Sequence, residues 1–110
     1  MNNDKILSLL GLATKSGKLV SGEFMVEKVV KEHKARLVII ATDTSDGSKK
    51  NYRDMCTFYH VPIYEYGTKE TLGHCIGKEI RAAVAVSDEG FAKSLIQKLE
   101  DLTANTEVVK

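Results

Sequence analysis

Apolar residues recur along the chain at two spacings, which predict helices alternating with strands. The i, i+3, i+4, i+7 spacing of a helical face is followed by Ile6, Leu9, Leu10 and Ala13, so we predict an amphipathic helix from residue 4 to about residue 15 that ends near Gly17. Similar spacing predicts four more helices. Their inward stripes are Val26, Val29 and Val30; Tyr52, Met55, Cys56 and Tyr59; Leu72, Cys75 and Ile76; and Phe91, Leu95, Ile96, Leu99 and Leu102.

Short apolar runs between these helices have no polar alternation, which is typical of strands buried on both faces. The two longest runs are 37–41, inside a strand predicted at 36–42, and 82–86. Shorter extended segments are expected at 18–20 and 63–66. The alternation of helix and strand predicts an α/β fold, a three-layer α/β/α sandwich around a small sheet. We expect one domain over residues 1–102.

Polar residues indicate where several of these elements begin and end. Ser21 and Thr68 are expected to cap the second and fourth helices, and Ser87 or Asp88 the last one. Residues 43–48 are expected to form a loop, and the polar C-terminal tail, 103–110, is expected to fray.

Length and composition bound the class of protein. A chain of 110 residues with 43% apolar residues is long enough to bury a core without disulfide or metal support. The longest apolar run, Leu37 to Ala41, is far too short for a membrane span. The N-terminus carries Asp4 where a secretory signal would be basic and apolar, so we expect a cytoplasmic protein with no membrane partner.

The residue types that support catalysis do not form a recognisable constellation. Cys56 and Cys75 lie on apolar helix faces without C-x-x-C spacing and are interpreted as free thiols, and the three histidines give no zinc spacing. The glycine-lysine segments at 11–18 and 73–79 both fail the spacing of a phosphate-binding P-loop. We therefore expect no catalytic residue, no metal and no small-molecule cofactor.

Charge is distributed unevenly although the net charge is only +1. Residues 1–36 carry seven basic and four acidic groups, whereas residues 88–110 carry three and five, an arrangement that allows a positive face. Two ordinary solvated surfaces are the alternative.

The second predicted helix begins with residues suited to phosphate. Lys18, Ser21, Gly22 and Glu23 open it, and its free N–H groups and positive dipole end favour an anion, with Lys28 and Lys31 along its outer face. A capped surface helix with solvated lysines would have the same sequence. Ile80, beside Arg81, is an apolar residue in an otherwise polar loop, although it could also be the first residue of the following strand.

Several segments together resemble a known family, the kink-turn RNA-binding ribosomal proteins named L-seven-A-e and L-thirty-e. The resemblance runs from about Gly17 to Phe91, and the string from Leu72 to Glu79 is most similar to the bacterial branch of small stand-alone members. The residues that carry it are Ser21-Gly22-Glu23, 35–43, Val61-Pro62, Leu72-Gly73 with Gly77, 82–86 and 88–92.

The resemblance implies a mixed four-stranded sheet between two helical layers and a mode of binding structured RNA. It assigns the helix-start contact to Gly22, a phosphate contact to Lys28, and the loop contacts to Ile80 and Arg81, with Lys18 as an auxiliary cation. The full candidate RNA-binding set is Lys18, Ser21, Gly22, Glu23, Lys28, Lys31, Ile80 and Arg81. Structured RNA, ribosomal RNA in particular, is the implied partner, together with ribosomal or translation proteins.

One departure from the family pattern separates two hypotheses. Classical members have Gly-Thr-Asn-Glu or Gly-Thr-Lys-Gln where this chain has Gly22-Glu23-Phe24-Met25, and the Phe24 and Met25 side chains cannot hydrogen-bond to base edges. We expect Phe24 to pack in the core, with stacking on a base as the alternative. A non-enzymatic RNA-binding protein is the leading hypothesis, and a protein-interaction adaptor on the same fold, without kink-turn specificity, is the second.

Overall fold

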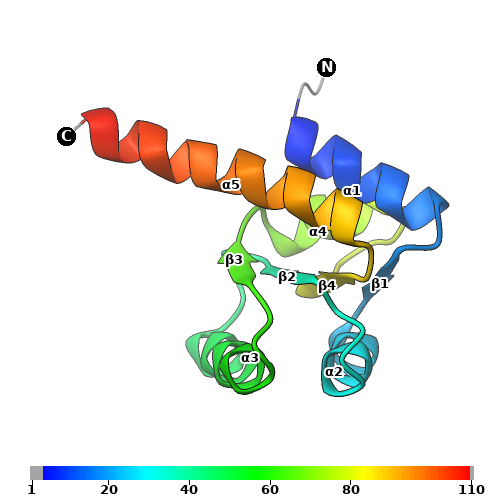
Figure 1. Cartoon of the computed structure of the whole chain (residues 1–110). Helices are drawn as coiled ribbons and strands as arrows, with labels where there is room; N and C mark the ends of the chain where they lie inside the picture. The colour runs from blue at the N-terminus through cyan, green and yellow to red at the C-terminus, as the bar shows by residue number, and fades with distance from the viewer. Residues whose placement is uncertain (1–3, 110) are drawn as a thin grey trace.

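The computed structural model describes residues 4–109, and the side chains of residues 4–102. Helices and strands alternate through most of the chain (Figure 1). In order they are α1 (Lys5–Lys15), β1 (Leu19–Ser21), α2 (Glu23–Lys31), β2 (Leu37–Ile40), α3 (Asp46–Tyr59), β3 (Ile63–Glu65), α4 (Lys69–Cys75), β4 (Ala83–Val86) and α5 (Glu89–Val109).

The four strands form one mixed sheet in the order β1-β4-β2-β3. β4 pairs antiparallel with both β1 and β2, and β2 pairs parallel with β3. The two strands predicted from unbroken apolar runs, β2 and β4, are the central ones, and every residue in them is buried. The predicted fold class is therefore confirmed.

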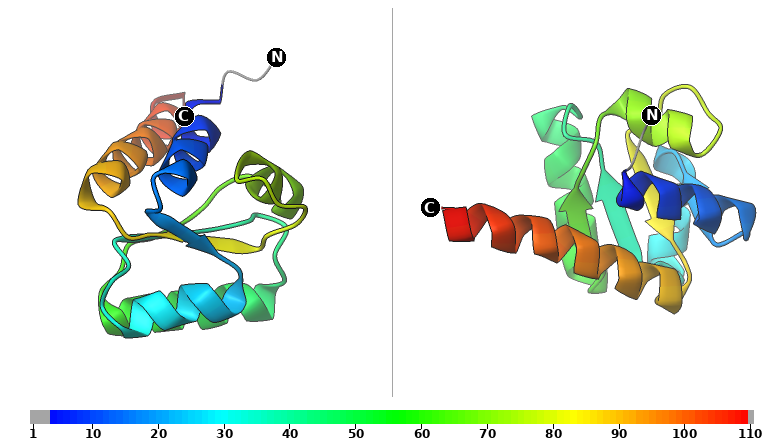
Figure 2. Two further views of the ribbon diagram at one scale, coloured as in Figure 1. Left: turned by 90° about the vertical axis from the view of Figure 1, so that its right-hand side faces the viewer. Right: turned by 90° about the horizontal axis from the view of Figure 1, so that it is seen from above.

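Helices cover both faces of this sheet (Figures 1 and 2). α1, α4 and α5 lie on one face, and α2 and α3 lie side by side on the other. Alternate strand residues supply the two halves of the core: Leu37 and Ile39 pack beneath α1, α4 and α5, whereas Val38 and Ile40 pack against α2 and α3. No helix within residues 4–109 is both long and apolar enough to cross a membrane.

Two helices begin at positions that differ from the predictions. α2 has Gly22 at its N-cap and no side-chain cap, so the capping role predicted for Ser21 was wrong; Ser21 is the last residue of β1. α3 begins at Asp46, within the predicted loop 43–48, because the Ser45 side chain accepts a hydrogen bond from the N–H of Ser48 and caps the helix early. The caps at Thr68 and Asp88 are confirmed.

The C-terminal helix is longer than predicted. α5 continues to Val109 through most of the segment that was expected to fray, because no glycine or proline interrupts residues 91–109. Its last turns extend beyond the sheet (Figure 2). Leu102, predicted to face inward, is 47% exposed, whereas Leu95 and Leu99 are buried as expected.

Candidate nucleic-acid interface

The structure brings five of the eight candidate residues to one end of the β1–β4 strand pair. Antiparallel pairing places Ser21 opposite Val84, and the N–H of Gly22 donates to the carbonyl of Ala83 over 3.1 Å. The start of α2 therefore lies beside the segment that leads into β4. That segment carries Ile80 and Arg81, which are distant in sequence from Ser21, Gly22 and Glu23.

Arg81 connects these two segments through its side chain. Its Nε donates to Oγ of Ser21 over 3.0 Å, its Nη1 donates to the carbonyl of Ile80 over 2.8 Å, and its backbone N–H donates to the carbonyl of Lys69 over 3.0 Å. Among the side chains of residues 4–102, no carboxylate forms an ion pair with Arg81. The guanidinium is thus held in place by neutral acceptors and keeps its charge for an anionic partner.

Gly22 gives the start of α2 a backbone conformation that other residues rarely adopt. Its φ is 91° and its ψ is 154°, and no side chain caps the helix. The N–H groups of Glu23, Phe24 and Met25 belong to the first helical turn, where no helix carbonyl is available to accept from them. Together with the positive end of the helix dipole, these groups favour a phosphate or another acceptor.

The loop before β4 is packed closely on α4 at Gly73. A Cβ added to Gly73 would lie 2.6 Å from the carbonyl oxygen of Glu79 and 2.8 Å from the backbone nitrogen of Ile80. The N–H of Lys78 also donates to the carbonyl of Gly73 over 2.8 Å. These contacts fix the loop while the side chain of Ile80 remains 59% exposed, outside β4, so Ile80 does not start the strand.

Lys28 and Lys31 lie on the exposed face of α2 as predicted, and each has an acidic partner one turn away. Nζ of Lys28 is 2.8 Å from Glu32, and Nζ of Lys31 is 2.6 Å from Glu27. The hydrogen bond from Lys28 lowers the pKa of Glu32, and the hydrogen bond to Glu27 raises the pKa of Lys31. The positive charge of this face is therefore partly offset.

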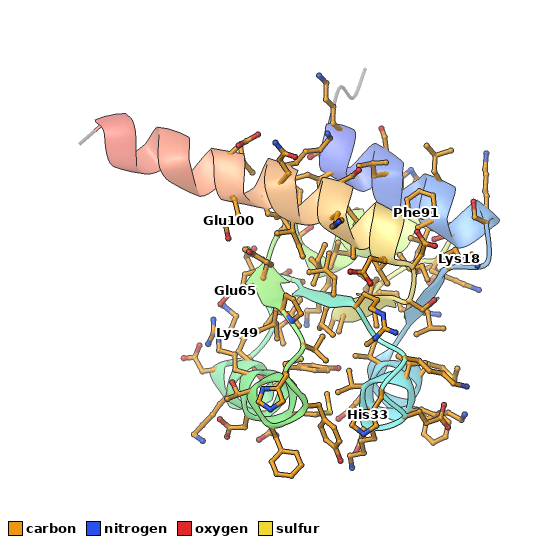
Figure 3. The ribbon with its side chains drawn as sticks, in the orientation of Figure 1. Lys18, His33, Lys49, Glu65, Phe91 and Glu100 are labelled. Atoms are coloured by element: carbon orange, nitrogen blue, oxygen red, sulfur yellow. The ribbon has the colours of Figure 1, made fainter. Side chains whose placement is uncertain are left out.

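Lys18 lies at the opposite end of β1 from the other candidates. Its carbonyl accepts from the N–H of Ser87 over 2.9 Å, whereas Gly22 lies beside Ala83, at the other end of the same strand pair. Lys18 is labelled in Figure 3. The structure therefore separates Lys18 from Gly22 and Arg81 by the length of a three-residue strand.

Two exposed side chains near the site were missed or misplaced by the sequence analysis. Phe24, expected in the core, is 75% exposed, because it lies two residues before the buried Val26 and therefore about 200° around the helix from it. The spacing of Val26, Val29 and Val30 in the sequence already indicates that Phe24 lies on the opposite side of the helix. Lys78, beside Gly77, is also exposed and has no ion pair within the part of the chain whose side chains are described.

The two thiols lie on different helices: Cys56 is buried on α3, and Cys75 is partly buried on α4. Burial raises the pKa of Cys56 and of Cys75 to about 11, so both are protonated near neutral pH. Neither therefore has the thiolate character of a nucleophile.

The fold and this surface define a class: a small α/β/α domain in which a glycine-started helix and the loop before a central strand form one exposed site. The chain belongs to the Ribosomal protein L7Ae/L30e/S12e/Gadd45 family, whose model matches residues 4–96. The family resemblance found in the sequence is thereby confirmed.

Two individual relatives share a name and cover most of the chain. The chain is 44% identical over 92 residues to a Bacillus subtilis (strain 168) protein named RNA-binding protein YlxQ, covering 84% of this chain and 92% of that protein. It is 34% identical over 99 residues to a protein of the same name from Enterococcus faecium, covering 90% and 95%.

Solved structures show the same fold. A Bacillus halodurans C protein described as having unknown function superposes with a TM-score of 0.81 at 39% identity, covering 84% of this chain and 94% of that one. The Giardia lamblia 15.5kD RNA binding protein superposes with a TM-score of 0.74 at 22% identity, covering 93% of each chain. The latter similarity supports the fold alone.

Proposed function

We propose that this protein is a non-enzymatic RNA-binding protein of the cytoplasmic translation apparatus, and that structured RNA, ribosomal RNA in particular, is its partner. The observation that carries the proposal is the hydrogen bond from Arg81 to Ser21, which joins the start of α2 and the loop before β4 into one surface. Relatives at 44% and 34% identity are named as RNA-binding proteins, which supports the choice of ligand.

The residues of this surface fit a bent or distorted RNA better than a regular duplex. The free N–H groups of α2 and the unpaired cation of Arg81 suit closely spaced phosphates, and the exposed Ile80 suits an unstacked base. Phe24 and Met25 supply no side-chain hydrogen bond to base edges. Recognition of a kink-turn by this chain would therefore depend on backbone and loop contacts.

A titration with two matched RNAs tests the proposal. One is a standard kink-turn, and the other is a duplex of the same length without its G·A pairs, both measured near physiological salt because phosphate contacts weaken steeply with salt. We expect the kink-turn to bind at least about tenfold more tightly, a difference of about 1.4 kcal/mol. Equal affinities would contradict shape-specific recognition, and no binding of either RNA would contradict the proposed function.

A protein-interaction adaptor is the second candidate, favoured by the exposure of Phe24 (75%) and Met25 (37%) on α2. Affinity capture of ribosomal and translation proteins, before and after nuclease treatment, separates the two candidates. Partners lost with the RNA support RNA binding, whereas partners that persist after nuclease support the adaptor.

A further inference from the structure

Phe24 is a large apolar side chain for which the fold provides no cover. It is 75% exposed in the first turn of α2, and among the described side chains it forms no aromatic ring contact. The buried side of the same helix is supplied by Val26, Val29 and Val30. Phe24 therefore contributes little to the core of this chain, and its ring is available to a partner.

The ring borders a shallow groove along the outer face of α2. The groove has a volume of about 380 Å³ and is lined by Phe24, Glu27, Lys28, Lys31 and Glu32. Lys28 follows Phe24 by four residues, so the two side chains are neighbours on the helix surface. An apolar ring and a cation thus lie side by side, in the arrangement that suits the base and the phosphate of one nucleotide.

We propose that Phe24 and Lys28 form a subsite for an unpaired nucleotide, in which the base stacks on the Phe24 ring and Lys28 contacts a phosphate. This inference rests on the proposed RNA-binding function and adds to it the kind of nucleotide that is read. Stacking requires no hydrogen bond to a base edge. Phe24 would therefore recognise the face of an unpaired base, whereas a polar side chain at this position would recognise a base edge.

The ion pairs of the groove are weak enough for Lys28 to leave Glu32 and contact a phosphate. Lys28 is bound to Glu32 over 2.8 Å, but both side chains are exposed, and such surface pairs contribute only about 0–1 kcal/mol. Glu32 also lies 3.4 Å from Nζ of Lys34. When Lys28 turns to a phosphate, Glu32 therefore retains a cationic neighbour.

Phe58 provides a matched comparison within the same chain. It is 74% exposed, but its ring packs edge-on against Tyr59 with centroids 4.9 Å apart. It lies in the last turn of α3, where the helix dipole is negative, and the residue four positions from it on the helix is Asp54, where Phe24 has the cation Lys28. These surroundings disfavour a phosphate, so Phe58 is an exposed phenylalanine outside the proposed subsite.

A thermodynamic cycle between protein and RNA tests the subsite. The two RNAs are a hairpin with a single-nucleotide bulge and the same hairpin with an abasic residue in the bulge. Dissociation constants are measured for the unsubstituted protein, Phe24→Leu, Phe24→Tyr and Phe58→Leu, with thermal unfolding to verify that each variant is folded. The cycle isolates the coupling between one ring and one base.

We expect loss of the bulged base to weaken binding by the unsubstituted protein about tenfold, in line with base–aromatic stacking. We expect the same loss for Phe58→Leu and Phe24→Tyr, and no effect of the base for Phe24→Leu. A base effect that persists in Phe24→Leu, or that disappears equally in Phe58→Leu, would overturn the subsite.

The failure of this proposal is distinguishable from failure of the proposed function. If Arg81→Glu weakens binding of both hairpins while Phe24→Leu changes nothing, RNA binding stands and the subsite is wrong. If the unsubstituted protein binds neither hairpin nor the kink-turn, both proposals are contradicted.

Discussion

Nε of Arg81 donates a hydrogen bond of 3.0 Å to Oγ of Ser21, a residue 60 positions earlier in the chain. The bond joins the end of an edge strand to the segment that leads into a central strand, at the point where α2 begins. Because Nη1 of the same guanidinium is bound to the carbonyl of Ile80, the loop and the helix start are fixed relative to each other. The candidate interface is therefore one preformed surface.

Substituting Ser21→Ala tests this relationship directly. Removing the hydroxyl frees Nε of Arg81, and we expect RNA affinity to fall about three- to tenfold, since a hydrogen bond to a charged group contributes about 1.5–3 kcal/mol and water replaces part of it. The control is Ser87→Ala, because the Ser87 hydroxyl bonds to the carbonyl of Lys18 at the other end of the same strand pair. If both variants lose affinity equally, the bond from Arg81 has no special role.

Gly22→Ala is expected to destabilise the protein. A Cβ at this position meets no atom within 4 Å, so the cost comes from the φ of 91°, which a residue with a side chain rarely adopts. Strain of this kind costs about 1–3 kcal/mol, and denaturant unfolding measures it. Gly47→Ala is the matched control near the start of α3: its Cβ also meets open space, its φ is not positive, and we expect a gain of about 0.5–1 kcal/mol. Equal effects of the two substitutions would contradict this explanation.

The central part of the fold could be predicted because its sequence pattern has a single interpretation. The runs that form β2 and β4 are apolar throughout, which indicates burial on both faces whatever the topology. The start of α2 could not be predicted in this way, because Ser21 has the chemistry of a cap. Because Ser21 pairs with Val84 of β4, it is the last residue of β1, and Gly22 becomes the N-cap of α2. This result depends on contacts between residues that are distant in the sequence.

The residues of the candidate site could be predicted from the sequence, but the hydrogen bonds that join them could not. Gly22, Ile80 and Arg81 stand out at the helix start and in the loop, and the family resemblance assigned their contacts. The structure brings them together, yet no pattern in the sequence indicates that Arg81 bonds to Ser21. The exposure of Phe24 is different, since its position relative to Val26 was readable from the sequence.

Reversing single charges is expected to weaken RNA binding and reduce its dependence on salt. Each cation that contacts a phosphate releases about one counterion, so Lys28→Glu and Arg81→Glu should each reduce the slope of log affinity against log salt by roughly one. Titrations at three or more salt concentrations measure this slope. Lys50→Glu is the control, because Lys50 is an exposed cation on α3, paired with Asp54, outside the proposed interface. Unchanged affinity in both test variants would exclude this surface.

The two thiols, one buried and one partly buried, predict a loss of stability at high pH. Burial raises the pKa of Cys56 from 9.0 to about 11, and it raises the pKa of Cys75 to about the same value. Between about pH 9 and pH 11 the unfolded chain therefore loses these protons before the folded chain does, and the free energy of unfolding falls as the pH rises. Denaturant unfolding at pH 8, 9, 10 and 11 measures the decline. We expect Cys75→Ala to decline less steeply than the unsubstituted protein, and parallel curves would contradict the assignment.

Glu32→Gln is expected to strengthen RNA binding. Glu32 is the ion-pair partner of Lys28 on α2 and of Lys34 in the segment after α2. Removing its charge therefore frees two cations and removes one anion from the proposed RNA-binding surface. We expect an increase in affinity of about two- to fivefold at low salt, because surface ion pairs contribute about 0–1 kcal/mol, and this increase should fade as salt is added. Asp54→Asn is the matched control: it breaks a similar exposed pair, with Lys50 on α3, and changes the net charge by the same amount. If Asp54→Asn strengthens binding as much as Glu32→Gln does, the effect is one of total charge. If only Glu32→Gln does so, the RNA lies along α2. In the free protein, the ion pair with Glu32, one turn after Lys28, then weakens the contact between Lys28 and the RNA.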